Sequence, residues 1–128
     1  MIWKIIITII LGLIIGLERE KQHKVIGIRT TSLITLGSTL FSIISIYLSE
    51  ADPARVIAQI VSGISFICIG IIVKEGNSVK GLTTSATIWC TSAIGVLVGV
   101  GLFKEAIFGT IAILIINIIF TYFKNGKE

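Results

Sequence analysis

Five long apolar stretches occupy most of this 128-residue sequence. Each contains 16 to 19 residues, close to the roughly 20 that an α-helix needs to cross a hydrocarbon core about 30 Å thick. Backbone groups in lipid must be hydrogen-bonded internally, and the period-two alternation of a membrane β-barrel is absent. The sequence therefore predicts an all-α membrane protein, a compact bundle of about five transmembrane helices. The five stretches are Ile2–Leu17, Thr31–Ser49, Arg55–Val73, Ser85–Leu102 and Glu105–Phe123.

The scarcity of charge excludes a soluble domain. Only 14% of the residues are charged and 54% are apolar, whereas soluble domains carry about 25% charged residues. The net charge of +4 comes from basic residues between the apolar stretches, without the aromatic interleaving of a nucleic-acid surface. We therefore expect a lipid bilayer, and no nucleic acid, as the partner of most of the surface. The sequence also lacks a catalytic triad, a phosphate loop and a Cys/His cluster, so we expect no enzyme.

Turn and capping residues support the boundaries between the stretches. Asp52 followed by Pro53 reads as an N-cap with proline at the first helical position. Thr83, Thr84 and Ser85 are candidate caps for the fourth helix, and Gly76-Asn77 marks a turn. Gly99 and Gly101 precede a tight connection at Lys104-Glu105. This last boundary leaves open whether the final two helices both span the membrane.

The distribution of lysine and arginine predicts an orientation. Eight basic residues lie in the first loop, the third loop and the C-terminal segment, against three on the other side. Positive charge accumulates on cytoplasmic loops. We therefore expect the N-terminus outside and the C-terminus in the cytoplasm.

Hydroxyl side chains recur along the second stretch with a period of about 3.5 residues, which places them on one seam of the helix. One interpretation is packing, because small hydroxyl residues let helices approach closely and form weak interhelical hydrogen bonds. The other is a hydrated path for an ion or solute. The residues of this seam are Thr31, Thr35, Ser38, Ser42, Ser45 and Ser49.

Glycines form similar seams on other helices. Such residues mark places where helix backbones touch, within one chain or between two copies. From them we expect a tightly packed bundle and a homodimer. The helix-packing residues predicted in this way are Gly12, Gly16, Gly63, Gly70, Gly95 and Gly99.

A few polar residues lie at depth or at helix ends. Gln59 shares a face of the third helix with Arg55 and Ser62, while Asn117 lies within the fifth helix. Amide side chains at such depth either form hydrogen bonds between helices or have a functional role.

The carboxylates Glu18 and Asp52 lie at helix ends, where hydrated Mg²⁺ needs only one or two oxygen ligands. The simpler interpretation is structural: Glu18 pairs with Arg29, and Asp52 caps a helix. We expect no cofactor, with Mg²⁺ at these two carboxylates as the alternative.

Three ordered blocks resemble the membrane domain of the MgtC/SapB family. They read LGLIIGLEREKQHKVIGIRTTSLITLGS, DPARVIAQIVSGISFICIG and GLTTSATIWCTSAIGVLVGVG, and the resemblance covers roughly residues 11–117. The resemblance implies a multi-pass protein of the bacterial cytoplasmic (inner) membrane. It also implies a role in growth under scarce magnesium, with some members regulating other membrane machines such as the F-type ATP synthase.

The family's polar residues fall on defined positions of this sequence, and they form the predicted site for an ion or a partner. Two departures stand out. Many members continue into a soluble C-terminal domain, whereas we expect residues 1–128 to form a single transmembrane domain. Ser65, Cys68 and Ile69 also stand where the family has smaller residues. The predicted site residues are Glu18, Arg19, Arg29, Thr30, Asp52, Arg55, Gln59, Ser62, Thr83, Thr84 and Trp89.

Two functions are consistent with these features. The first is a non-catalytic membrane protein of magnesium homeostasis or stress adaptation, which acts through helix–helix contact with another membrane protein. The alternative is a secondary transporter or channel for magnesium or another small solute.

Overall fold

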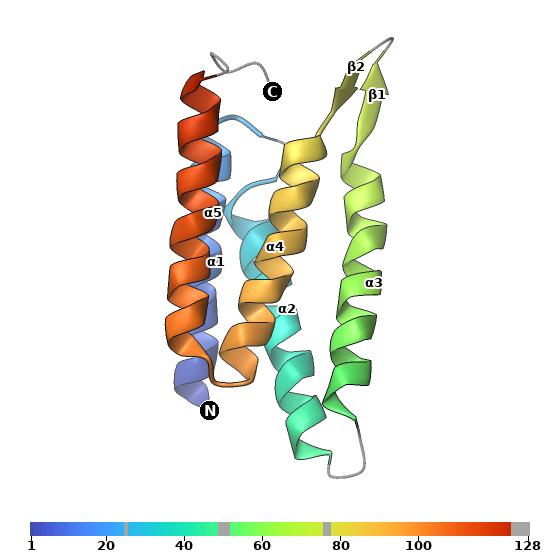
Figure 1. The fold of residues 1–128 in the computed structure, drawn as a ribbon, viewed down its shortest axis with the longest axis vertical. Coiled ribbons are helices and arrows are strands. Elements are labelled where there is room, and N and C mark those ends of the chain that lie inside the picture. Colours follow the sequence, from blue (N-terminus) through green and yellow to red (C-terminus); the bar gives the residue numbers. More distant parts are fainter. Residues whose placement is uncertain (25, 49–51, 76–77, 124–128) are drawn as a thin grey trace.

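The described part of the chain forms five helices that run back and forth through the bundle (Figure 1). The structure is a computed structural model that describes residues 1–24, 26–48, 52–75 and 78–123. A short antiparallel hairpin, which the sequence did not predict, joins α3 to α4 and pairs Val73 with Lys80. The elements are α1 (Ile2–Lys21), α2 (Ile28–Tyr47), α3 (Pro53–Ile71), β1 (Val73–Glu75), β2 (Ser78–Lys80), α4 (Leu82–Gly99) and α5 (Phe103–Phe123).

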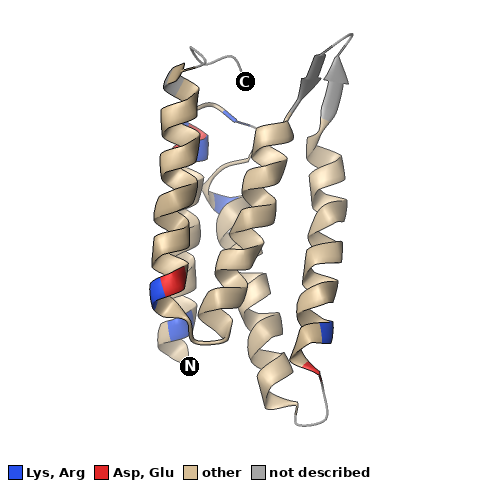
Figure 2. Ribbon diagram, in the orientation of Figure 1, with Lys and Arg blue, Asp and Glu red and all other residues tan. Residues whose placement is uncertain are grey.

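The lengths of the helices match the thickness of a membrane. In the described part of the chain, α2, α3, α4 and α5 are long and apolar enough to span a bilayer. α1 has 20 residues and runs alongside them (Figure 1), but it carries Lys4, Glu18 and Arg19. Charged residues gather towards the two ends of the bundle (Figure 2). α4 and α5 both have the length to cross, which favours full spans over a shallow hairpin.

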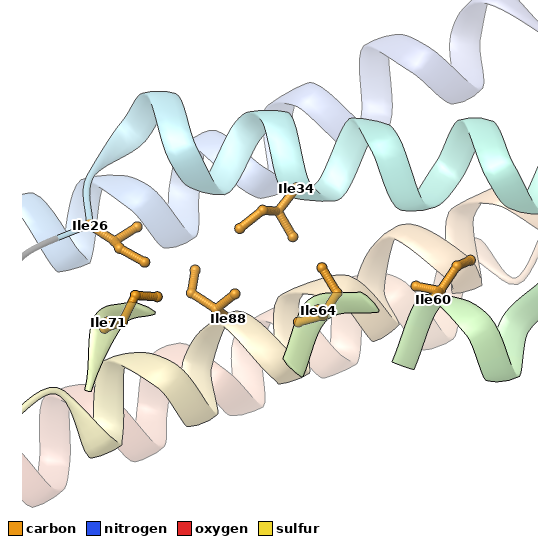
Figure 3. Close-up of a cluster of buried hydrophobic side chains, with 6 residues drawn as sticks. All are labelled: Ile26, Ile34, Ile60, Ile64, Ile71 and Ile88. Atoms are coloured by element: carbon orange, nitrogen blue, oxygen red, sulfur yellow. The ribbon is translucent and has the colours of Figure 1, made fainter. Parts of the chain in front are cut away.

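The centre of the bundle is formed by α1, α2 and α4. α5 lies against α1 and α4, and α3 packs on the other side against α2 and α4. One apolar cluster joins α2, α3 and α4 through isoleucines such as Ile34, Ile64 and Ile88 (Figure 3). A second cluster joins α1, α4 and α5 through Leu11, Ile15, Ile94, Val98 and Ala106. The apolar core is therefore split into two parts that flank the central contact of α1, α2 and α4.

The N-terminal end of α1 is attached to the turn between α4 and α5. The Lys4 ammonium donates a hydrogen bond of 2.8 Å to the carbonyl of Gly99, the last residue of α4. This places a positive charge at the negative end of the α4 dipole. Trp3 stacks at a tilt on Phe103, with 4.5 Å between ring centroids. The connection between α4 and α5 is Val100–Leu102, so Lys104 and Glu105 lie inside α5 and the predicted boundary there is displaced.

The helix starts confirm one capping prediction and correct another. The Asp52 side chain accepts a 3.0 Å hydrogen bond from the Ala54 amide, and Pro53 is the first residue of α3. α4 begins instead after Gly81, which has a φ of 87° and no side-chain cap. The prediction that Thr83, Thr84 and Ser85 cap this helix is wrong, because Gly81 supplies the left-handed turn from the hairpin. Gly76-Asn77 and Ser49 lie outside the described residues.

We expect Asp52→Ala to lower the free energy of unfolding by about 1 kcal/mol, because the substitution removes the cap of α3. Asp52→Asn is the matched control, since asparagine caps as well as aspartate. Unfolding in mixed micelles, followed by helical circular dichroism, measures both variants. Equal losses for alanine and asparagine would mean that the charge of Asp52, and not its capping bond, stabilises this end.

Candidate functional site

A buried ion pair between neighbouring residues of α1 forms the centre of the candidate site. Arg19 is fully buried and Glu18 is 6% exposed. Arg19 donates from Nε to Glu18 Oε1 at 2.7 Å and from Nη2 to Glu18 Oε2 at 2.9 Å. This two-point contact is the geometry in which a guanidinium binds a carboxylate most strongly. Both carboxylate oxygens of Glu18 are therefore engaged within the chain.

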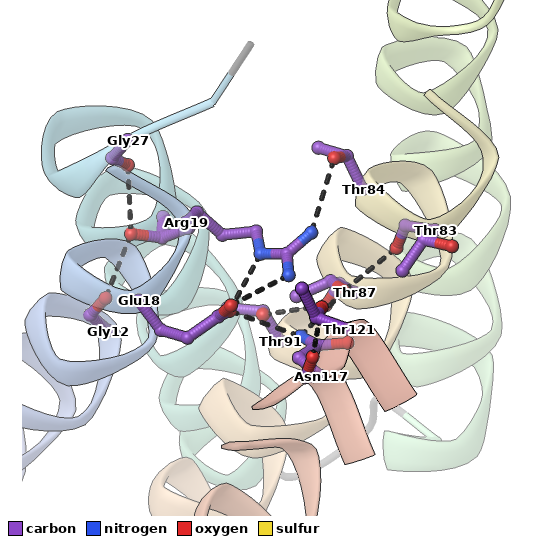
Figure 4. A network of polar contacts seen from close by, with 11 residues as sticks. Gly12, Glu18, Arg19, Gly27, Thr83, Thr84, Thr87, Thr91, Asn117 and Thr121 are labelled. Carbon is purple, nitrogen blue, oxygen red and sulfur yellow. Dashed lines mark hydrogen bonds and ion pairs between the residues drawn. The ribbon is translucent and has the colours of Figure 1, made fainter. Parts of the chain in front are cut away.

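Two further helices complete the surroundings of this pair (Figure 4). Thr84 on α4 accepts a 3.4 Å hydrogen bond from Arg19 Nη1. Asn117 on α5 lies with its Nδ2 3.4 Å from Glu18 Oε1 and 3.1 Å from Thr87 Oγ1. The Glu18–Arg19 site, as we call Glu18, Arg19, Thr84, Thr87 and Asn117, thus connects the last turn of α1 with α4 and α5.

The predicted partner of Glu18 was wrong. Arg29 lies exposed in the first turn of α2, while Glu18 pairs with Arg19. Glu18 and Arg19 both face the interior because α4 and α5 cover the end of α1. The sequence had singled out Asn117 only as a polar residue in an apolar helix, and nothing in the spacing assigned it to Glu18. Its partner lies 99 residues away in the chain.

A polar seam continues from this site along the contact of α1, α2 and α4. Thr31 Oγ1 of α2 donates to the Gly12 carbonyl of α1 at 2.8 Å. Thr39 Oγ1 lies 2.8 Å from both Thr8 Oγ1 and the Gly95 carbonyl, so one hydroxyl joins three helices. Thr35, Ser38, Ser42 and Ser45 are also buried. The predicted seam is therefore real, and it faces helices rather than the outside of the bundle.

Most other hydroxyls of the core donate to carbonyls of their own helix. Ser42 bonds to the Ser38 carbonyl at 2.8 Å, and Thr91 bonds to that of Thr87 at 2.7 Å. Among the described residues, Ser32 Oγ is the buried side-chain polar atom without a hydrogen-bond partner. The seam thus behaves as a polar core whose donors are used inside the chain.

Four of the six predicted packing glycines lie at close helix contacts. A Cβ on Gly12 would come within 3.0 Å of Ser32 Cα, and one on Gly16 within 2.6 Å of Ile28 Cα. A Cβ on Gly95 or Gly99 would meet Ser38 or Ser42 at 2.7 and 2.5 Å. The packing prediction is wrong within this chain for the glycines of α3, since no atom lies within 4 Å of such a Cβ on Gly63 or Gly70.

One of the remaining predicted site residues touches the Glu18–Arg19 site, because the Thr83 carbonyl accepts a 2.8 Å hydrogen bond from Thr87 Oγ1 (Figure 4). The others do not join it. Thr30 is exposed beside Arg29, Thr83 is half-buried, and Trp89 is exposed on α4. Asp52 and the exposed residues Arg55, Gln59 and Ser62 belong to the N-terminal half of α3. Glu18 lies in the last turn of α1 and Asp52 caps the start of α3, and these two helix ends lie at opposite ends of the bundle (Figure 1), so the two carboxylates cannot share a metal ion.

Metal ligands and thiols are sparse in the described part of the chain. Its residues contain no group of three or more His, Cys, Asp or Glu side chains placed to hold a metal ion. Cys68 and Cys90 are free and half-buried, in keeping with their interpretation as small packed side chains. Cys68 and Ser85 bind each other reciprocally: Sγ is 3.3 Å from the Ser85 carbonyl, and Ser85 Oγ is 3.1 Å from the Cys68 carbonyl. These contacts attach α3 to α4.

A helical bundle with apolar spans and a paired polar core defines a multi-pass membrane protein. The chain belongs to the MgtC family, whose pattern matches residues 5–125. Protein MgtC of Salmonella typhimurium is 44% identical over 118 residues, which are 92% of this chain and 51% of that protein. Protein MgtC of Brucella abortus is 47% identical over 109 residues, 84% of this chain and 46% of that protein.

An uncharacterised protein of Synechocystis is 44% identical over 116 residues, covering 90% of this chain and 50% of that protein. The chain thus spans about half the length of the curated relatives that it matches. No solved structure matches it significantly.

Proposed function

We propose that this chain is a non-catalytic regulator of other membrane proteins that acts in magnesium homeostasis or in adaptation to scarce magnesium. Membership of the MgtC family supports the physiological setting. We place the protein in the bacterial cytoplasmic membrane, with the N-terminus outside and the basic end of α1 in the cytoplasm. Its means of action is contact between transmembrane helices, and the partner is another integral membrane protein, for which the F-type ATP synthase is a candidate.

The observation that carries this proposal is that the polar groups of the core are hydrogen-bonded to one another within the chain. Both oxygens of Glu18 are held by Arg19, and one is also approached by Asn117. Dehydrating a magnesium ion is costly, and a site for it must offer free oxygen ligands. The hydroxyls of the seam donate to backbone carbonyls of α1, α2 and α4. An ion that passed along this seam would have to break those bonds, so the arrangement favours a static, packed core over a path.

The outer surface supports the mode of action. Large apolar side chains are exposed on every helix, among them Phe66, Trp89 and Phe108. The sequence suggested Gly12 and Gly16 as contacts within one chain or between two copies, and α2 of the same chain occupies both. A leucine there would disrupt the bundle itself. We therefore expect another membrane protein to contact the exposed helix faces.

Magnesium uptake by proteoliposomes tests the proposal. We expect vesicles with folded wild-type protein and a trapped magnesium-sensitive dye to take up Mg²⁺ no faster than protein-free vesicles. Glu18→Gln should leave this rate unchanged, because Glu18 binds Arg19 and no ion. Asp52→Asn is the matched control at the opposite end, and circular dichroism checks that each protein is folded. Saturable uptake that falls in Glu18→Gln would refute the regulator and establish a transporter.

A further inference from the structure

A groove of about 550 Å³ lies between α2 and α3. Leu33, Gly37 and Phe41 of α2 line one wall, and Gln59 and Gly63 of α3 belong to the other. No atom lies within 4 Å of the position that a Cβ would take on Gly37 or Gly63. Small residues on both walls leave room for the backbone of another helix to approach closely.

The groove continues into an exposed stripe along α3. This helix buries only Ile60, Ile64 and Ile71, and the isoleucines face α2 and α4 (Figure 3). Residues at helical spacing on a neighbouring face are exposed, and Phe66 is exposed by 80%. The α3 stripe, as we call this face, comprises Asp52, Arg55, Gln59, Gly63, Phe66 and Gly70.

The polar residues of the α3 stripe require a partner that lipid tails cannot provide. Gln59 lies six residues after Pro53, roughly 9 Å along the helix axis, and therefore inside the hydrocarbon layer. Within the described residues, its side chain has no hydrogen bond, and Arg55 has no ion pair. An amide in hydrocarbon without a hydrogen-bond partner is strongly unfavourable. Whatever covers the stripe must offer both a donor and an acceptor at this depth.

A second copy of the chain meets this requirement. A two-fold contact brings the same patch of both copies together, so the patch must be complementary to itself. An amide pairs with an amide, because each has a donor and an acceptor. In two parallel copies, Arg55 of one also lies level with Asp52 of the other. Asp52 uses Oδ1 for its cap and keeps its second oxygen for a guanidinium.

We propose that the chain forms a parallel homodimer in which the α3 stripe and the α2–α3 groove of one copy pack against those of the other, with the two Gln59 amides hydrogen-bonded across the two-fold axis. The bulky Leu33, Phe41 and Phe66 and the open glycines provide protrusions and recesses on the same surface. Gly12, Gly16, Gly95 and Gly99 are used inside each copy, so the dimer rests on glycines of a different face. This proposal is independent of whether the protein regulates or transports.

Energy transfer between donor- and acceptor-tagged full chains in lipid vesicles tests the dimer. We expect Gln59→Leu to weaken self-association about tenfold, as loss of a polar interhelical contact of 1–2 kcal/mol implies. Gly63→Ile should weaken it further by filling the recess, although the single chain has space for the side chain. Ser65→Leu is the matched control, because Ser65 is an exposed polar residue on another side of α3. It should leave association unchanged.

Three outcomes would overturn the proposal. Wild-type copies that show no energy transfer would mean that lipid or a different membrane helix covers the groove. Self-association that survives both Gln59→Leu and Gly63→Ile would place the dimer contact on another face. Equal weakening by Ser65→Leu would indicate a general effect on α3. Circular dichroism of each variant in the same vesicles separates loss of association from loss of fold.

Discussion

Arg19→Met should lower the free energy of unfolding by about 3–5 kcal/mol, because removing one partner of a buried ion pair leaves the other charge without compensation. Glu18 is 6% exposed and would retain only the weak contact from Asn117. Thr84 Oγ1 would also lose the hydrogen bond that it accepts from Arg19 Nη1. Titration of the folded protein with a denaturing detergent, followed by helical circular dichroism, measures the change.

Two controls separate the loss of charge pairing from the loss of packing. Lys21→Met removes an exposed cation from the same turn of α1 and should change the free energy of unfolding by no more than about 0.5 kcal/mol. The double variant Glu18→Gln/Arg19→Met removes both charges and should be markedly more stable than Arg19→Met alone. If the double variant is as unstable as the single one, Arg19 stabilises the bundle by its bulk and not by its charge.

Gly95→Ala should destabilise the bundle by about 1–3 kcal/mol, the usual cost of overpacking. The new methyl group would lie 2.7 Å from Ser38 Cβ and would also meet the Thr35 carbonyl. The carbonyl belongs to the backbone of α2 and cannot turn aside. α4 would have to move away from α2, which would break the hydrogen bond of Thr39 to the Gly95 carbonyl.

Gly70→Ala, measured in detergent at a dilution that keeps copies apart, provides the matched comparison, since Gly70 is helical and has no atom within 4 Å of its Cβ position in the single chain. There alanine should stabilise the protein by about 0.5–1 kcal/mol through its higher helix propensity. The two substitutions are chemically identical, so the same unfolding measurement should give opposite signs. A stabilising Gly95→Ala would mean that α2 and α4 are not held at this short distance.

The sequence was sufficient to predict the five helices and the hydroxyl seam, because both depend on local patterns. Apolar length defines a membrane span, and a period near 3.5 residues places Thr31, Ser38 and Ser45 on one face of a helix whatever that face contacts. The cap of α3 was predictable for the same reason, as Asp52 and Pro53 act on the adjacent turn.

Features that depend on which helices meet could not be predicted. The simpler interpretation of the sequence paired Glu18 with Arg29, whereas Glu18 pairs with Arg19 because α4 and α5 cover the end of α1. Asn117 completes that site from a distant part of the chain. The glycines of α1 and of α4 are four residues apart and those of α3 are seven residues apart, and either spacing places a pair on one face of a helix. Only the arrangement in space shows that α3 turns its isoleucines, and not its glycines, towards the bundle.

The central position of α4 has a consequence for biosynthesis. α1 and α2 emerge before α4, and their contact buries part of the hydroxyl seam, but Thr39 lacks the Gly95 carbonyl until α4 has been inserted. Lys4 likewise cannot form its hydrogen bond until the Gly99 carbonyl, 95 residues later in the chain, has been inserted. α3, which enters the membrane before α4, finally occupies the periphery. The nascent protein must therefore keep a space beside α1 and α2 open to the fourth helix, and its core closes only when α4 has been inserted.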